Sequence, residues 1–167
     1  SLILNGKKNF VIDASISDYL IVTAKDESGL NTLIIVVDSK SKGIEYNDKV
    51  HMDSRTYSDL KFNNVKIDKN NFLSFEGDGK SILDKTFDIA RVGLAAEMLG
   101  SVQEAFEITM KYLKEREQFG VKIGSFQALQ HRSALMFGEI ELCKSIVLKA
   151  LQSIDSNDPN LSKNASL

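Results

Sequence analysis

The residues with the clearest chemical potential lie in one short stretch of this sequence, from Tyr112 to Gln130. The stretch places Arg116 at the expected end of a long helix, followed by an aromatic-glycine turn and a second helix whose start carries Gln127. A guanidinium can clamp a pyrophosphate through two parallel hydrogen bonds, and a glutamine amide offers a donor and an acceptor. These residue types could thus hold a phosphate-bearing ligand, although the residues taken alone favour a purely structural interpretation. Alternatively, Arg116 is simply favourable at a helix C-terminus, and Gln127 lies in the first turn of an exposed helix.

Other potentially reactive side chains indicate no catalytic set and no metal site. His51 and His131 lack neighbours at metal-ligand spacing, and no Ser/His/Asp arrangement is evident. Cys143, the single cysteine, lies on an apolar helical stripe and is expected in the core. We expect His131 on a helix surface and His51 in a loop, with no catalytic residue and no metal ligand in this chain.

Two long helices are expected to frame the Arg116 region. From about Ser81 to Glu115 the sequence contains no proline, and its apolar residues recur at helical spacing. A second helix is expected to run from Ser125, a good N-cap residue, to about Ile154, with the loop Gln118 to Gly124 folding it back on the first. The segment from Leu161 to Leu167 has the pattern of a helix that is beginning.

The N-terminal part of the sequence indicates strands instead. Tyr19–Ala24 and Leu30–Val37 are rich in β-branched and aromatic residues and are separated by turn residues, which predicts a hairpin. Further strands are predicted at Ile44–Val50 and Ser58–Ile67. In the second of these, polar and apolar residues alternate, so one face is expected to be solvated. The sheet is expected to be antiparallel.

The sequence pattern changes after the stretch of glycine and acidic residues at 76–79. We therefore predict an α+β fold with a domain boundary there. Residues 1–76 are expected to form part of an antiparallel β-barrel or sheet domain, and residues 77–167 part of a domain of long antiparallel helices of the four-helix-bundle type.

The composition excludes several classes of protein. With 43% hydrophobic and 26% charged residues, and no apolar run near the roughly 20 residues of a membrane span, the sequence is typical of a globular protein. A net charge of −2 gives no broad basic face for nucleic acid. The single cysteine and the lack of a signal-like start favour a cytoplasmic setting. The chain opens without a methionine, directly into apolar residues, as a fragment would.

The stretch from Arg116 to Gln127 closely resembles the flavin-binding helix hairpin of the acyl-CoA dehydrogenase family, whose pattern is Arg-x-Gln-Phe-Gly followed by Phe-Gln. The residues that match in order and spacing are Arg116, Gln118, Phe119, Gly120, Phe126 and Gln127. The segment Asp88 to Gly100 is similar to the family's segment that contacts the acyl-CoA thioester, and Leu4 to Asp13 resembles the strand that ends against the flavin ring. The resemblance covers essentially the whole chain.

The resemblance implies FAD as the cofactor, in this family usually bound across a subunit interface. The residues implied to hold its adenosine and pyrophosphate part are Arg116, Gln118, Phe119 and Gln127. Phe10 would lie beside the isoalloxazine, where the family commonly has tryptophan, and Ile12 stands where many members have a threonine that hydrogen-bonds flavin N5. Asp88 and Arg91 would contact the pantetheine and ribose-phosphate part of CoA. Alternatively, these two form an exposed Asp-Arg pair one helical turn apart.

By the same resemblance, the intact protein would be a flavoprotein oxidoreductase of fatty acid metabolism. It would catalyse α,β-dehydrogenation of an acyl-CoA thioester and pass electrons to an acceptor protein. The family's catalytic glutamate usually lies beyond the position of Leu167, so the chain alone would be inactive. The small-residue face from Gly93 to Gly100 and the apolar stripe from Leu135 to Leu151 need covering partners. We therefore expect a homodimer, a homotetramer or a heteromer with a related subunit.

Two departures from the family pattern leave another hypothesis open. Ile12 has no side-chain donor for flavin N5, although a backbone amide could replace it. Ala90 occupies the alternative position of the base in some members and cannot act as one. The alternative is a non-catalytic relative whose helices serve only oligomer assembly. A third hypothesis, an unrelated β-plus-helix binding module, requires the match from Arg116 to Gln127 to be a coincidence.

Overall fold

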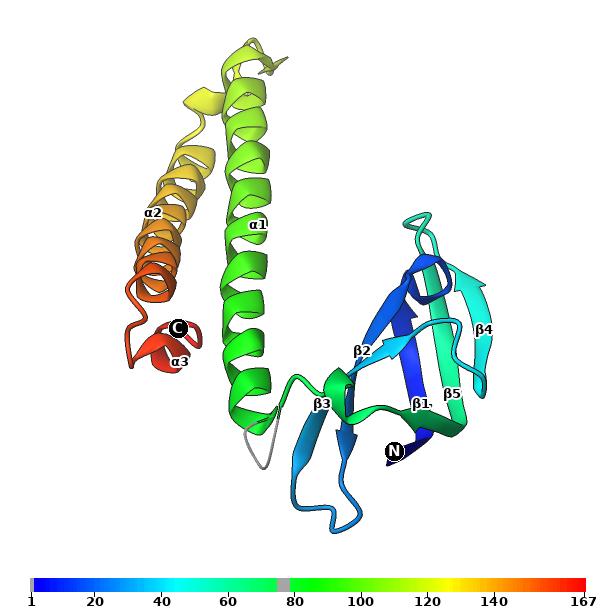
Figure 1. Ribbon diagram of the computed structural model, residues 1–167. Coiled ribbons are helices and arrows are strands. Elements are labelled where there is room, and N and C mark those ends of the chain that lie inside the picture. Colours follow the sequence, from blue (N-terminus) through cyan, green and yellow to red (C-terminus); the bar gives the residue numbers. More distant parts are fainter. Residues whose placement is uncertain (1, 75–78) are drawn as a thin grey trace. The chain divides into compact units, whose positions relative to one another are not determined.

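The computed structural model describes residues 2–74 and 79–167, which form two compact units. The first unit extends to Leu83 and is built mainly of strands, and the second extends from Asp84 to Leu167 and is built mainly of helices (Figure 1). The predicted domain boundary between residues 76 and 77 lies outside the described residues, so it stays a prediction.

The first unit contains antiparallel sheets, as the sequence predicts. Strands β1 (Leu2–Ile12), β5 (Thr56–Ile67) and β4 (Ile44–Val50) form a three-stranded sheet in that order. Strands β2 (Tyr19–Lys25) and β3 (Thr32–Asp38) pair as a separate two-stranded sheet. The predicted hairpin and the predicted later strands are therefore confirmed, with β5 beginning before the expected Ser58.

Alternation along β5 explains how the core of this unit forms. Leu60 and Phe62 are buried, whereas Lys61 between them is exposed, because successive side chains of a strand point to opposite faces. One face of the sheet is thus solvated, as expected. The buried apolar residues that pack into one cluster are Leu4, Ala14, Leu20, Val22, Ile35, Val37, Leu60, Phe62, Val65 and Ile67.

Strand β1 departs from regular pairing in two places. Its register with β5 shifts between Leu4 and Gly6, and again between Lys8 and Val11. In the second irregularity Phe10 has a φ of 60°, a left-handed conformation that is uncommon for a bulky residue. Because a bulge bends the strand and re-aims its side chains, this irregularity determines how Phe10 is presented.

Helices α1 (Gly79–Glu115) and α2 (Gln127–Asp155) run antiparallel to each other and are followed by the short α3 (Leu161–Asn164) (Figure 1). Helix α1 ends at the residue that the sequence predicts, because helical spacing of apolar residues continues without proline to Glu115. Helix α3 begins where a further helix was expected. The α+β class, with antiparallel sheets and long helices, is confirmed.

The predicted N-cap of the second helix is wrong. Helix α2 begins at Gln127 with Phe126 as its N-cap, and Ser125 instead ends a 3₁₀ turn that spans Ile123–Ser125. The Ser125 hydroxyl donates to the backbone oxygen of Lys122 at 2.7 Å, so it serves the 3₁₀ turn. The Ser125 side chain thus forms a local hydrogen bond within the 3₁₀ turn instead of capping α2.

The segment predicted as a plain loop, Gln118 to Gly124, contains more structure than expected. Strands β6 (Glu117–Gln118) and β7 (Val121–Lys122) form a small antiparallel hairpin. The sequence signal was weak, because the turn residues are Phe119 and Gly120 rather than the usual Asn-Gly or Asp-Gly.

Two further observations concern the helix surfaces. Cys143, expected in the core, is exposed, because it lines an open groove between α1 and α2. His131 is exposed on α2, as predicted. A Cβ added at Gly93 or Gly100 would meet nothing within 4 Å, so no described part of the chain packs on the small-residue face at these positions. Within residues 2–74 and 79–167, none of the helices has the length and apolar character of a membrane span.

Candidate functional site

The corner between α1 and α2, from Leu113 to Ala128, is held together by backbone contacts. The amide of Arg116 donates to Tyr112 O at 2.9 Å, so this residue continues the last turn of α1. The amide of Ile123 donates to Arg116 O, also at 2.9 Å. A Cβ on Gly124 would lie 2.7 Å from the backbone oxygen of Leu113, a contact that requires glycine. The start of α2 is therefore tied to the end of α1 beside Arg116.

The turn of the β6–β7 hairpin presents an aromatic ring from a strained backbone. Phe119 has a φ of 55° and Gly120 a φ of 79°, the pair of positive values that a type I′ turn requires. Glycine adopts such values readily, whereas a phenylalanine there is an outlier. Phe119 is nevertheless 92% exposed, and its ring contacts Phe126 only edge-on, with centroids 6.2 Å apart. The strained backbone and the exposure of Phe119 indicate that its ring serves in ligand binding and not in packing.

The charged side chains of the hairpin are paired with each other, but Arg116 is not. Lys122 Nζ lies 2.7 Å from Glu117 Oε1 and donates to Glu115 O at 3.0 Å, so it also stabilises the C-terminus of α1. Among the residues that the structure describes, no hydrogen bond or ion pair engages the guanidinium of Arg116. This cation therefore remains free to meet an anion.

The glutamines and the start of α2 add further polar groups to this corner. Gln118 Nε2 donates to Glu117 O at 2.7 Å, which leaves its amide oxygen as an acceptor. Gln127 is exposed and opens α2, whose N-cap residue Phe126 provides no side-chain hydrogen bond. The first-turn amides of α2 therefore keep the partial positive charge of a helix N-terminus. The first-turn amides of α2 and the guanidinium of Arg116 are groups of the kind that bind a pyrophosphate.

Phe10 and Ile12, the other residues implied in cofactor binding, lie on the surface of the first unit. Phe10 is 56% exposed and Ile12 is 50% exposed. The amide of Phe10 donates to Asp59 Oδ1 at 3.0 Å, and Asp59 also pairs with Lys49. The hydrogen bond from Lys49, followed by that from the Phe10 amide, holds the pKa of Asp59 below its ordinary value. The accessibility of both residues is compatible with contact to a ligand.

Phe10 belongs to an aromatic cluster with His51 and Tyr57 that the sequence analysis missed. The ring centroids lie 4.8 Å apart for Phe10 and His51, and 4.4 Å apart for the two other pairs. The Tyr57 hydroxyl donates to Asp53 Oδ2 at 2.6 Å, which lowers the pKa of Asp53 and raises the pKa of Tyr57. No pattern in the sequence predicts this cluster, because the contacts of Phe10 with the other rings depend on the irregularity in β1.

Asp88 and Arg91, implied in CoA binding, are paired with each other on α1. Arg91 Nη1 lies 2.7 Å from Asp88 Oδ1, and the side chains are 59% and 11% exposed, respectively. The alternative of an exposed pair one turn apart is thus right about the pairing and wrong about Asp88, which is buried. Arg91 also lies 6.0 Å from the centroid of the Phe87 ring. Asp88 therefore orients an arginine whose guanidinium still faces solvent.

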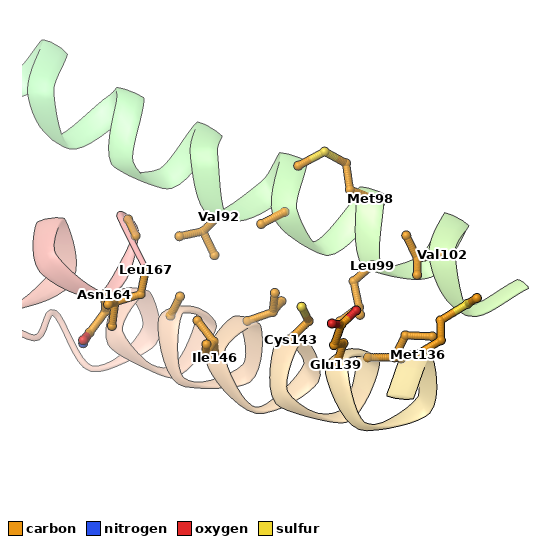
Figure 2. A pocket seen from close by; sticks show the side chains of 15 residues that line it. Val92, Met98, Leu99, Val102, Met136, Glu139, Cys143, Ile146, Asn164 and Leu167 are labelled. Carbon is orange, nitrogen blue, oxygen red and sulfur yellow. The ribbon is translucent and has the colours of Figure 1, made fainter. Parts of the chain in front are cut away.

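An apolar groove of about 380 Å³ lies between α1 and α2 (Figure 2). It is lined by side chains such as Val92 from α1 and Met136 and Cys143 from α2. Of its polar lining residues, Asn164 is already engaged, since its Nδ2 donates to Ser153 Oγ at 2.8 Å. Such a lining is typical of a helix-packing surface. In the described segments, no group of three or more His, Cys, Asp or Glu side chains is placed to hold a metal ion.

Comparison with known proteins places these features in a family. Residues 77–167 match the family model of the acyl-CoA dehydrogenase C-terminal domain. The chain is 36% identical over 162 residues to the 3-(aryl)acrylate reductase of Clostridium sporogenes, covering 93% of this chain and 43% of that protein. It is 34% identical over 171 residues to the caffeyl-CoA reductase-Etf complex subunit CarC of Acetobacterium woodii, covering 99% and 45%. The chain thus spans less than half the length of these relatives.

Solved structures agree with this assignment. The butyryl-CoA dehydrogenase of Megasphaera elsdenii superposes with a TM-score of 0.86 at 30% identity, covering 98% of this chain and 44% of that chain. The FAD complex of PigA superposes with a TM-score of 0.83 at 29% identity, covering 94% and 43%. The cofactor of the family is FAD. This chain belongs to the acyl-CoA dehydrogenase family of flavin-dependent oxidoreductases.

Proposed function

We propose that this chain supplies the FAD-binding corner and part of the acyl-CoA site of an enzyme that catalyses α,β-dehydrogenation of an acyl-CoA thioester. The observation that carries the proposal is Arg116, whose guanidinium has no partner in the described chain and whose backbone oxygen accepts from Ile123 in the segment just before the uncapped N-terminus of α2. FAD supplies the redox chemistry, and the protein binds and orients the reactants. Residues 1–76 and 77–167 are proposed as parts of a middle β-domain and a helical domain.

At the corner, each residue has a separate task. Arg116 binds the pyrophosphate of FAD with two parallel hydrogen bonds, and the first turn of α2 adds its positive end. Gln127 contributes an amide donor, and Gln118 contributes its amide oxygen as an acceptor, with one N–H of its amide group bonded to Glu117 O. The exposed Phe119 ring packs against the adenosine part. The strained turn is then stabilised by the ligand that it contacts.

In the first unit, Phe10 and Ile12 are proposed to lie beside the isoalloxazine. The exposed Phe10 ring offers a flat apolar surface to the flavin. Ile12 has no side-chain donor, so this position could supply a hydrogen bond to flavin N5 only from its backbone amide.

On α1, Asp88 and Arg91 are proposed to bind acyl-CoA. Arg91 would meet the ribose-phosphate and pantetheine part of CoA through its exposed guanidinium. Asp88, buried and bonded to Arg91, would fix the direction of that guanidinium. No catalytic base is assigned within this chain, since Ala90 cannot abstract a proton.

Acyl-CoA, an electron-transfer protein and further subunits are the proposed partners. One relative is named as a subunit of a reductase-Etf complex, which supports an electron-transferring flavoprotein as the redox partner. Large apolar side chains on both long helices, such as Leu94, Ile108 and Leu135, are exposed and support assembly into a dimer, a tetramer or a heteromer.

Reduction of an α,β-unsaturated acyl thioester is a second candidate function. It is favoured by the names of two of the curated relatives, which are called reductases. The reduction is the chemical reverse of dehydrogenation, so the same binding corner serves both directions.

Titration of the chain with FAD, followed by flavin fluorescence, tests the proposal. Arg116→Ala should weaken FAD binding by roughly 10- to 100-fold, because a hydrogen bond to a charged group contributes about 1.5–3 kcal/mol. Arg132→Ala is the matched control, since Arg132 is an exposed arginine within α2. Its FAD affinity should equal that of the unmodified chain.

Two results would contradict the proposal: failure of the unmodified chain to bind FAD, or equal affinities for Arg116→Ala and Arg132→Ala. Stable oligomers that bind no FAD would support the assembly-only role instead.

A further inference from the structure

We propose that Asp53 and Tyr57 are positioning residues for Phe10, which they hold so that its ring can receive a planar ring system at the end of β1. The inference rests on the proposed function, because the ring system assigned to this place is the isoalloxazine of FAD. Neither Asp53 nor Tyr57 is among the residues that the family resemblance implicates.

The backbone of Phe10 is fixed where regular strand pairing would not put it. Its φ of 60° falls within the register shift between Lys8 and Val11. Its amide donates to Asp59 Oδ1 at 3.0 Å, a side-chain acceptor in place of a ladder carbonyl. Asp59 on β5 is paired with Lys49 on β4. Residues of three strands thus determine the direction in which the Phe10 side chain leaves the backbone.

The ring of Phe10 is held by two neighbouring rings. His51 meets it edge-on, at 4.8 Å and an interplanar angle of 86°, and Tyr57 packs at 4.4 Å with a tilt of 32°. His51 and Tyr57 also contact each other, with centroids 4.4 Å apart. These are favourable aromatic geometries. Because Phe10 remains 56% exposed, part of its ring stays accessible to a ligand.

Asp53 anchors Tyr57 and is itself anchored by the turn between β4 and β5. The Tyr57 hydroxyl donates to Asp53 Oδ2 at 2.6 Å, and Asp53 Oδ1 accepts from the amide of Arg55 at 3.0 Å. The amide of His51 donates to Arg55 O at 3.4 Å, so the same turn carries the second ring that touches Phe10. Loss of the Tyr57–Asp53 hydrogen bond should therefore loosen the ring of Phe10.

Packing of the core does not explain this arrangement. A buried tyrosine needs a partner for its hydroxyl, which alone would account for the bond to Asp53. It does not account for Phe10, which lies outside the apolar core cluster and carries a left-handed backbone that a bulky residue adopts only under constraint. The backbone of Phe10 is strained, and its exposed side chain is held in place by residues of several strands. This combination indicates that the ring contacts a ligand.

The test compares Tyr57→Phe with Tyr46→Phe as the matched control. The Tyr46 hydroxyl donates to Ser39 O at 2.7 Å, so each substitution removes one tyrosine hydrogen bond in the same unit. In the ligand-free chain, NMR of ring-labelled phenylalanine should show faster flipping of the Phe10 ring in Tyr57→Phe only. In FAD titrations, Tyr57→Phe should weaken binding about fivefold to tenfold and shift the flavin absorption band. Tyr46→Phe should keep the unmodified values.

Two variants of Asp53 separate positioning from simple loss of stability. Asp53→Asn keeps an oxygen for the Arg55 amide and places an NH2 group that can donate to the Tyr57 hydroxyl oxygen. The link to Tyr57 is thus retained with its direction reversed, so the FAD affinity and flavin spectrum should stay close to those of the unmodified chain. Asp53→Ala should reproduce the effects of Tyr57→Phe.

An unchanged Phe10 flip rate in Tyr57→Phe would overturn the inference. Unaltered FAD affinity and absorption in that variant would also overturn it, and in both cases the FAD site itself would stand. Failure of the unmodified chain to bind FAD would contradict the proposed function and the inference together. This outcome is seen without any variant, so it can be told apart from a failure of the inference alone.

Discussion

Gly124 lies so close to the backbone of Leu113 that a Cβ on Gly124 would sit 2.7 Å from the Leu113 oxygen. This contact joins the segment before α2 to the last turns of α1. The hydrogen bond from Ile123 N to Arg116 O, at 2.9 Å, joins the same two segments. The relative placement of Arg116 and Gln127 therefore depends on a glycine that has no chemistry of its own.

Gly124→Ala should destabilise the helical unit by about 1–3 kcal/mol, because the added methyl group forces the two backbone segments apart. Gly138→Ala is the control. Gly138 lies within α2, and a Cβ added there would meet nothing within 4 Å. That change should raise the free energy of unfolding by up to about 1 kcal/mol. Urea denaturation curves measure both. Equal effects of the two changes would show that the contact with Leu113 does not constrain the corner.

Phe119→Asn should stabilise the chain while weakening its binding of FAD. Asparagine tolerates the left-handed backbone of this turn, so the change should add up to about 1 kcal/mol to the free energy of unfolding. The loss of the ring removes its contact with the adenosine part of FAD. Thermal melting and FAD titration measure the two effects. A variant that is more stable and binds FAD as tightly as the unmodified chain would show that Phe119 has no part in binding.

Within the same turn, Gly120→Ala serves as the control for backbone geometry. Its φ of 79° is unfavourable for alanine, so this variant should lose stability where Phe119→Asn gains it. Opposite signs for the two changes would confirm the type I′ turn.

Acid should remove the contribution of Asp59 to the stability of the first unit. The hydrogen bonds from Lys49 and from the Phe10 amide depress the pKa of Asp59 in the folded chain. A carboxyl with a depressed pKa stabilises the fold above its unfolded pKa of about 4, and this stabilisation is lost as the pH falls through the folded pKa. The difference in stability between the unmodified chain and Asp59→Asn should therefore be present at pH 7 and vanish in strong acid. Denaturation curves over this pH range would show a constant difference if Asp59 were not engaged.

The helices and most strands could be predicted because their patterns are local. Apolar residues at helical spacing without proline defined the end of α1 at Glu115, and alternation on β5 identified its buried face. The N-cap at Ser125 could not be predicted, because the hydroxyl of that serine is used by the 3₁₀ turn that precedes α2. Cys143 was expected in the core, since an apolar stripe does not say whether a neighbouring element covers it.

For the candidate site, the residues of the α1–α2 corner could be named from sequence because they are contiguous along the chain. The cluster of Phe10, His51 and Tyr57 could not, since it is assembled by the irregularity in β1 and by a pairing between distant strands. The burial of Asp88 was also missed, because the packing around a helix face is a tertiary property.

The central claim is that the α1–α2 corner holds the adenosine and pyrophosphate part of FAD, and isotope-edited NMR tests it most directly. ADP carries only that part of the cofactor. Separate titrations of the chain with FAD and with ADP should therefore produce the same chemical-shift changes at this corner. We predict that both ligands shift the side-chain Nε–H of Arg116 and the backbone amides of Gln127 and Ala128. Binding of FAD that leaves these signals in place, with shifts confined to other residues, would contradict the account.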